Sequence, residues 1–176
     1  MRIIAGKHRG RVLTSFSGER VRPTPDRVKE SLFQILSDRI AGARVLDLFS
    51  GSGALGLESL SRGAREVCFN DSCRESLALV KKNLTLLKEE AKLTQQDFRT
   101  CLSNASGKFD LIFCDPPYAE GFLEEILQIV QARGLLSVGG LVVYESEREE
   151  EAIEGWEAVD IRRYGRTKIF MFGEKP

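Results

Sequence analysis

Near the middle of the chain, an acid, two prolines and an aromatic residue, Asp115-Pro116-Pro117-Tyr118, directly follow an apolar run. Each proline fixes its φ at about −65° and lacks an N–H group, and the second keeps the first out of the helical region. The segment predicts a stiff corner where the Asp115 carboxylate and the Pro116 carbonyl accept hydrogen bonds beside the flat ring of Tyr118. Such a corner suits a planar base with an exocyclic amine, although a plain strand-ending turn uses the same residue types.

A second segment, Gly51 to Gly56, fits the G-x-G-x-x-G pattern of dinucleotide-binding loops. Asp71 follows about 20 residues later, as that fingerprint requires, so a nicotinamide or flavin cofactor is one interpretation. Asp47, however, ends the strand before the loop, where its charge would repel a pyrophosphate. It favours a cofactor with positive charge, and S-adenosylmethionine carries an ammonium and a sulfonium group. The glycines would let the backbone approach such a cofactor closely.

The other predicted cofactor residues also lie at the ends of successive strands. Asp71 can accept hydrogen bonds from ribose hydroxyls, and Asp97 with Phe98 can bind the adenine amine and pack on its ring. Alone, Asp47 would be read as a helix cap or ion-pair partner and Asp97 as an N-cap, but their shared position favours a binding site. The predicted cofactor-binding set is Asp47, Phe49, Ser50, Gly51, Gly53, Asp71, Ser72, Asp97 and Phe98.

Charge is balanced overall but unevenly distributed along the chain. Lys and Arg total 26, and so do Asp and Glu, yet four basic residues precede Glu19, the first acid. A basic arm can neutralise phosphates, so we expect nucleic-acid contacts there, while a solvated charged terminus is the plainer explanation. The predicted nucleic-acid-binding residues are Arg2, Lys7, Arg9, Arg11, Arg22 and Arg27.

Residue usage argues against several other classes of protein. The single histidine, His8, argues against a His-ligated zinc site or a Ser-His-Asp triad in the body of the chain, and we expect no metal. The four cysteines form no C-x-x-C pair, which is typical of reduced thiols in the cytoplasm. No apolar run approaches the roughly 20 residues of a membrane span, and none follows the basic N-terminus as in a secretory signal. We expect a cytoplasmic protein with neither a membrane nor a stable protein partner.

The elements that must position these residues alternate between strand and helix. The predicted strands are 44–49, 66–70, 93–96, 109–114 and 138–144, and the predicted helices are 54–62, 77–87 and 122–134. This alternation predicts an α/β fold, in which helices cover both faces of a parallel sheet. Ligands of such sheets bind at the carboxyl ends of the strands, where all the candidate cofactor and base-binding residues fall.

Both ends of the chain are predicted to be hairpins. An N-terminal β-hairpin extension pairs 2–5 with 11–13 around a basic tip, and a second hairpin pairs 159–164 with 167–172. After the first hairpin, Thr24 is the predicted N-cap of a helix whose first residue is Pro25. We expect one domain over 1–176, in which 1–40 form the hairpin and helix and 41–176 form the cofactor-binding core.

The segments Asp47 to Gly53 and Asp115 to Tyr118 together resemble the class I S-adenosylmethionine-dependent amino-methyltransferases. Almost the whole chain resembles the bacterial RsmD family, which methylates the N2 amine of a guanine in 16S ribosomal RNA. Two positions depart from that family: Cys73 stands where a second acid is common, and Gln34 where an asparagine is frequent. The stretches that carry the resemblance are 1–6, 22–24, 27–33, 47–58, 109–118 and 144–147.

The resemblance implies a Rossmann-like fold with a seven-stranded, mostly parallel sheet and a reversed last strand. It implies 16S rRNA or a small-subunit particle as the partner. It also implies catalytic roles for Asp115, Pro116, Pro117 and Tyr118. Instead of RNA, Arg22 and Thr24 could contact the carboxylate of the cofactor. Three alternatives stay open: a methyltransferase acting on adenine N6 in DNA or RNA, a NAD-binding oxidoreductase, and an inactive RNA-binding protein.

Overall fold

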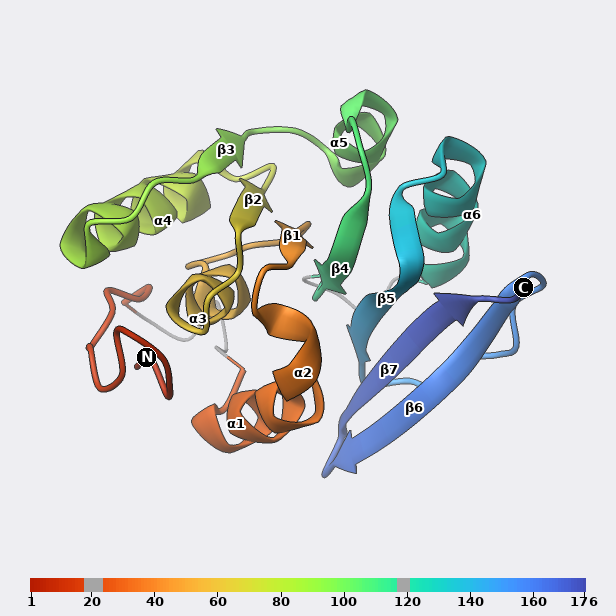
Figure 1. The fold of residues 1–176 in the computed structure, drawn as a ribbon, viewed down its shortest axis with the longest axis horizontal. Coiled ribbons are helices and arrows are strands. Elements are labelled where there is room, and N and C mark those ends of the chain that lie inside the picture. Colours follow the sequence, from red (N-terminus) through yellow and green to blue (C-terminus); the bar gives the residue numbers. More distant parts are fainter. Residues whose placement is uncertain (18–23, 117–120) are drawn as a thin grey trace.

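The computed structural model describes residues 1–17, 24–116 and 121–176, and these form a sheet of seven strands with helices packed against it (Figure 1). The strand order is β3-β2-β1-β4-β5-β7-β6. The strands are β1 (Arg44–Asp47), β2 (Glu66–Asn70), β3 (Lys92–Thr94), β4 (Phe109–Cys114), β5 (Leu136–Ser146), β6 (Trp156–Tyr164) and β7 (Thr167–Glu174). The helices are α1 (Asp26–Ile35), α2 (Ser37–Ile40), α3 (Ala54–Ser61), α4 (Arg74–Leu87), α5 (Phe98–Asn104) and α6 (Leu123–Arg133).

The pairing of the strands confirms the predicted fold class. Strands β1 to β5 pair in parallel, whereas β7 runs antiparallel to both β5 and β6. The reversed last strand is therefore inserted between β5 and β6 rather than added at the edge. Among the described residues no helix is both long and apolar enough to cross a membrane.

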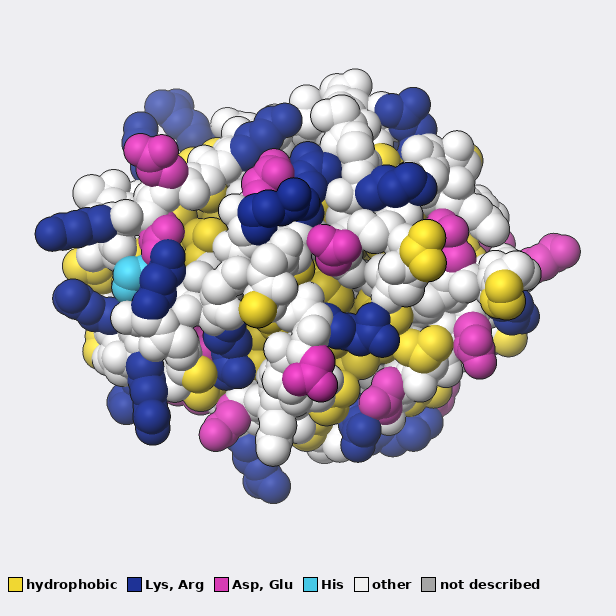
Figure 2. Space-filling view, in the orientation of Figure 1, with side chains coloured by type: hydrophobic (Ala, Val, Ile, Leu, Met, Phe, Trp, Pro, Cys, Tyr) yellow, Lys and Arg dark blue, Asp and Glu magenta, His cyan; other side chains and the backbone are white. Residues whose placement is uncertain are grey.

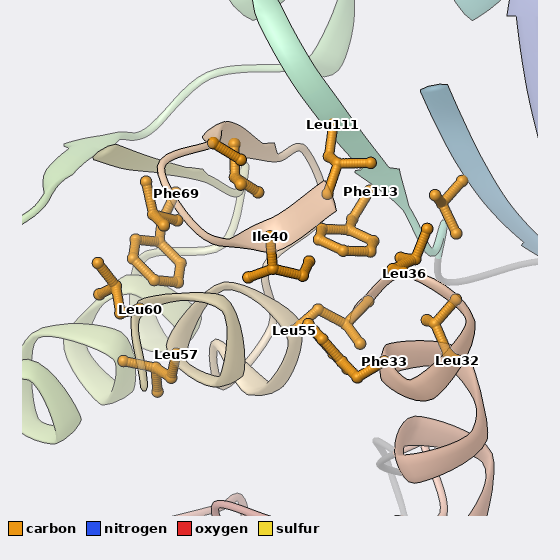
Figure 3. Packing of buried hydrophobic residues seen from close by; sticks show 14 of the residues in the cluster. Leu32, Phe33, Leu36, Ile40, Leu55, Leu57, Leu60, Phe69, Leu111 and Phe113 are labelled. Atoms are coloured by element: carbon orange, nitrogen blue, oxygen red, sulfur yellow. The ribbon is translucent and has the colours of Figure 1, made fainter. Parts of the chain in front are cut away.

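Alternate residues of the central strands feed two separate hydrophobic clusters, one on each face of the sheet. Leu111 and Phe113 of β4 face the cluster built with α1, α2, α3 and α4, while Ile112 and Cys114 face the cluster built with α5 and α6. Figure 3 shows the first cluster, in which Phe33 of α1 packs against Phe113 with ring centroids 5.8 Å apart. Burial on both faces explains why β4 reads as a continuous apolar run.

The N-terminal hairpin forms but is shorter than predicted: Arg2 is bridged to Val12 in antiparallel fashion, whereas the N–H groups of Ile4 and Ala5 bind Glu58 instead. The predicted start of the next helix, however, is wrong by one residue. Helix α1 begins at Asp26, so Pro25 occupies the N-cap position and supplies no side-chain cap. Thr24 does not cap the helix, because its hydroxyl donates a hydrogen bond to Glu145 Oε2 at 3.3 Å instead.

Two short helices were not predicted, α2 and α5, because segments of four and seven residues carry too few turns to show a periodic apolar stripe. Strand β1 ends at Asp47, two residues before the predicted end, because the chain turns into the glycine loop there. Strand β5 is longer than predicted at both ends, since Leu136 pairs with Phe109 and Ser146 with Lys168.

Candidate functional site

Four acids gather where the parallel strands end, at the carboxyl edge of the sheet. Asp47 ends β1, Asp71 directly follows β2, Asp115 directly follows β4, and Glu145 is the second-last residue of β5. Asp47 stands in register with Phe69 of β2 and Phe113 of β4, so the ends of these three strands lie side by side. The topology therefore brings together the acids that the sequence places far apart.

Asp47 is buried, with only 2% of its surface exposed, and its Oδ2 accepts the backbone N–H of Gly56 in the first turn of α3 at 2.9 Å. Burial raises the pKa of Asp47 to about 7, which the Gly56 hydrogen bond opposes and the charge of Asp71 reinforces. None of the described Lys or Arg side chains forms an ion pair with it. A buried acid of this kind is stabilised by a ligand that brings positive charge.

The glycine loop between β1 and α3 takes its shape from two left-handed residues, Gly51 at φ 53° and Gly53 at φ 88°. A side chain at Gly53 would also press on Leu57 and Val80, each 3.1 Å from the position of an added Cβ. Beside them, the hydroxyl of Ser50 is buried and has no hydrogen-bond partner among the described residues. Because an unpaired buried hydroxyl costs free energy, Ser50 fits a loop that binds a polar ligand.

Asp71 connects the loop to the end of β2. Its Oδ2 accepts the N–H of Gly51 at 2.9 Å, and its Oδ1 accepts the N–H of Cys73 at 2.8 Å. Each carboxylate oxygen has a second lone pair, so both can still accept a ribose hydroxyl. Cys73 thus contributes a backbone donor that orients Asp71, which does not require an acidic side chain at that position, and the neighbouring Ser72 is exposed.

Asp97 and Phe98 have structural roles in α5. Asp97 is the N-cap of this helix and accepts the N–H of Arg99 at 2.9 Å. The ring of Phe98 is buried between those of Phe49 and Phe122, at centroid distances of 5.6 and 5.0 Å. The cap that the sequence left as an alternative for Asp97 is therefore present, and cofactor binding by Asp97, Phe49 and Phe98 stays a prediction.

Asp115 and Pro116 lie at the end of β4, partly accessible at the surface, while Pro117 and Tyr118 lie outside the described residues. Burial of the carboxyl group raises the pKa of Asp115 well above its usual range, and the charges of Glu145 and then Asp47 raise it further. The neighbouring acids of the carboxyl edge thus disfavour the ionised form of Asp115. Bound donors or cations would stabilise that form.

Two buried asparagines that sequence reasoning missed support the site. The side-chain amide of Asn70, at the end of β2, donates to the carbonyls of Leu48 at 3.1 Å and Gln96 at 3.0 Å. The amide of Asn83, on α4, donates to the carbonyls of Thr14 at 2.9 Å and Ser52 at 3.2 Å. Neither belongs to a motif, and only their buried positions in the folded chain reveal these roles.

The N-terminal hairpin is seated on α3 through a buried charge network. Glu58, fully buried, accepts the N–H groups of Ile4 at 2.9 Å and Ala5 at 3.0 Å. Lys29, also buried, donates to the carbonyl of Arg2 at 2.6 Å and lies 3.6 Å from Glu58. Burial lowers the pKa of Lys29, and the charges of Glu58 and Asp26 oppose that shift. The network fixes the backbone that carries the predicted nucleic-acid-binding residues.

Those basic residues differ in what they contact. Lys7 forms an ion pair with Glu89 at 2.5 Å, so part of its charge is already balanced. Arg2 and Arg9 line a shallow cleft of about 390 Å³ together with Asp26 and Glu30 of α1. Figure 2 shows Lys and Arg side chains on the side of the molecule where the hairpin lies, with acidic side chains among them. Arg11 and Arg27 are exposed, and Arg22 lies outside the described residues.

S-adenosylmethionine fits the donors and acceptors of this edge: Asp47 for a cationic group, Asp71 for a ribose, and the loop glycines for close approach. The buried Ser50 hydroxyl, which has no hydrogen-bond partner among the described residues, is the observation that most directly indicates a ligand there. Within the described part of the chain, no group of three or more His, Cys, Asp or Glu side chains is arranged to hold a metal ion.

Comparison with known proteins gives consistent matches over nearly the whole chain. Residues 1–173 match the family model described as Conserved hypothetical protein 95. Ribosomal RNA small subunit methyltransferase D of Escherichia coli K12 is 39% identical over 150 residues, which cover 85% of this chain and 76% of that protein. The Bacillus subtilis protein YlbH is 39% identical over 99% of this chain and 100% of its own length. The solved structure of Escherichia coli yhhF superposes with a TM-score of 0.88 and 32% identity, covering 100% of this chain and 98% of that one.

Proposed function

The chain belongs to the family described as Conserved hypothetical protein 95, and from that membership we propose that it is an S-adenosylmethionine-dependent rRNA methyltransferase acting on the exocyclic N2 amine of a guanine in small-subunit (16S) rRNA. The relative named ribosomal RNA small subunit methyltransferase D supports the substrate class. The observation that carries the chemistry is the acidic carboxyl edge, where buried Asp47 stands in register with the strand that Asp115 directly follows.

The cofactor would lie over the glycine loop. When bound, S-adenosylmethionine supplies an electrophilic methyl group on a positively charged sulfur. Asp47 would hold its ammonium group, because that pairing replaces a buried acid of raised pKa with a buried ion pair. Asp71, already oriented by the N–H groups of Gly51 and Cys73, would accept the ribose hydroxyls.

The amine would be held by the corner that follows β4. The lone pair of a guanine N2 is delocalised into the ring, which makes it a poor nucleophile. Asp115 and the Pro116 carbonyl would accept hydrogen bonds from its two N–H groups and hold the nitrogen pyramidal, with its lone pair directed at the methyl group. The nitrogen–methyl bond would form as the sulfur–methyl bond breaks, and the methylated amine would then release one proton to Asp115 or to water. Positioning of this kind contributes several kcal/mol, roughly 7–11 in well-oriented systems. From the sequence, we expect Pro117 to stiffen the corner and Tyr118 to stack on the base.

The base must leave its stack to reach this edge, so the substrate is an extruded or single-stranded nucleotide. The hairpin is attached to the cofactor loop itself, since Ser52 Oγ lies 3.3 Å from Met1 Sδ and Asn83 bridges Ser52 to Thr14. Basic residues on the hairpin would therefore bind the RNA backbone at a fixed distance from the methyl donor.

The test is to incubate the protein with tritium-labelled S-adenosylmethionine and, in separate reactions, with 16S rRNA, small-subunit particles and DNA. We expect label in N2-methylguanosine from the ribosomal substrates. Label in N6-methyladenine would establish the adenine alternative, and no transfer to any substrate would contradict the proposal. A thermal shift produced by NAD but not by S-adenosylmethionine would favour the oxidoreductase.

A further inference from the structure

We propose that Glu145 determines the specificity of the reaction by accepting the N1–H of the target base, so that the site selects guanine. The proposal rests on the proposed function, because it assigns a role inside the same site. Residues 144–147 are one of the stretches that carry the family resemblance, but the sequence alone assigns no role to Glu145.

The pairing of β4 with β5 places Glu145 beside Asp115. Cys114 and Tyr144 are register partners in this parallel pair, and the next residues along the two strands are Asp115 and Glu145. Neighbouring strands lie about 4.8 Å apart, so the two carboxyl groups leave the same edge of the sheet as close neighbours. The charge of Glu145 is accordingly the strongest charge acting on Asp115.

A second contact holds the Glu145 carboxylate in place. The hydroxyl of Thr24, just before α1, donates to Oε2 at 3.3 Å, and Oε1 accepts no hydrogen bond from the part of the chain that the structure describes. Burial raises the pKa of Glu145, the Thr24 hydrogen bond opposes this, and the charge of Glu147 adds to it. The nearby Glu149 is paired with Arg163 and Lys168, whereas no described Lys or Arg side chain forms an ion pair with Glu145.

Guanine offers this pair of acids an arrangement that adenine does not. Its N1–H and N2 amine are adjacent donors on one edge, so that Asp115 and the Pro116 carbonyl can bind the amine while Glu145 binds N1–H. Adenine places a bare N1 lone pair beside its amine, and that lone pair would face the lone pairs of Glu145. A site built to accept a hydrogen bond rejects an analogue that lacks the donor, because a buried polar group is then left unpaired.

The test compares guanine with 2-aminopurine at the mapped target position of an RNA fragment, since 2-aminopurine keeps the N2 amine but has a bare N1. The wild-type protein should show a higher kcat/KM for the RNA with guanine than for the RNA with 2-aminopurine. In Glu145→Gln the amide can donate to a bare N1, so the guanine preference should fall by roughly 10- to 100-fold, the range expected for one unpaired buried group. Affinity for S-adenosylmethionine, measured by calorimetry, should not change.

The matched control is Glu157→Gln, the same change at an exposed position on β6. It should leave the preference unaltered. If Glu145→Gln does not fold, Thr24→Val decides instead, because it removes the hydrogen bond to Glu145 without a change in charge and should lower the preference in the same direction. An unaltered preference in the folded variant overturns the role of Glu145 while N2-methylguanosine formation by the wild type still stands. Failure of the wild type to label guanine overturns the proposed function itself.

Discussion

At the scale of single residues, the carboxyl edge of the sheet holds acids whose ionised forms the fold disfavours. Asp47 and Asp115 have raised pKa values because burial and neighbouring acids disfavour their ionised forms. A cationic cofactor and the N–H donors of a base would each stabilise those forms. Binding of these groups would therefore offset part of the free energy that burial of the two acids costs.

Asp47 should make the affinity for S-adenosylmethionine depend on pH. Its pKa of about 7 means that the free protein carries a proton there below neutrality, and that proton must leave before an ammonium group can pair with the carboxylate. Affinity should therefore fall by up to tenfold per pH unit below about pH 6, where the carboxyl group of Asp47 is protonated. Calorimetry across this range measures the effect, and Asp47→Asn should give weak binding without the pH dependence.

The same group should influence the stability of the cofactor-free protein with a definite sign. In the unfolded chain Asp47 releases its proton near the usual 3.8, whereas in the folded protein it does so at about 7. The folded state therefore binds more protons between these values, and stability falls as pH rises through this interval. Urea unfolding at about pH 7 should show Asp47→Asn to be at least as stable as the wild type. A clear loss of stability would mean that Asp47 is favourably paired without a cofactor.

Asp115 should be required for transfer but not for cofactor binding. Asp115→Asn keeps the shape of the side chain but replaces an acceptor oxygen with an amide donor facing the amine. We expect kcat to fall by at least about 100-fold, similar to the loss of one preorganised hydrogen-bonding group in other enzymes. Single-turnover transfer measures this, with S-adenosylmethionine affinity as the control. Turnover close to wild type would contradict the acceptor role.

At the scale of elements, the junction of α1, α3 and the hairpin depends on the buried pair of Lys29 and Glu58. Glu58→Ala should destabilise the protein by about 3–5 kcal/mol, because it leaves Lys29 buried without its partner. Urea unfolding measures the change. Glu66→Ala, which removes an exposed ion pair with Arg44, is the matched control and should cost no more than about 1 kcal/mol.

The elements also show how far the sequence could lead. The apolar run of β4 and the glycine turn after β1 can be predicted from the sequence. Burial on both faces requires apolar residues, and a left-handed backbone favours glycine. Helix α5 cannot be predicted in this way, since it is short and its cap, Asp97, looks like a ligand residue at a strand end. In the same way Asn70, Asn83 and Glu145 gain their roles only from residues that are distant in sequence.

At the scale of the whole molecule, the net charge is zero, but the N-terminal hairpin carries exposed arginines. The backbone of this hairpin is held by hydrogen bonds to Glu58 and Lys29. Acidic side chains lie among the basic ones on this surface, so its described residues form no large area of uniform positive charge. RNA affinity should therefore depend on contacts of individual arginines with phosphates.

Arg9 and Arg11 should act as phosphate contacts. Replacing both with Gln should weaken RNA binding and reduce the slope of log affinity against log salt by about 1.4, or 0.7 for each contact with a single strand. Filter binding over a range of salt concentrations measures this. Arg162→Gln combined with Arg163→Gln removes two arginines that already pair with Asp160 and Glu149, and should leave the slope as it was. An unchanged slope in the hairpin variant would exclude the phosphate role.

One side chain connects the glycine loop to the base of the N-terminal hairpin. The amide of Asn83 is shared between the Ser52 carbonyl in the glycine loop and the Thr14 backbone at the base of the hairpin. A shift of the loop on cofactor binding would strain or relax the hairpin through this one group. Such a linkage is reciprocal, so RNA must alter cofactor affinity by the same factor as the cofactor alters RNA affinity. The shared amide therefore predicts heterotropic cooperativity between methyl donor and RNA.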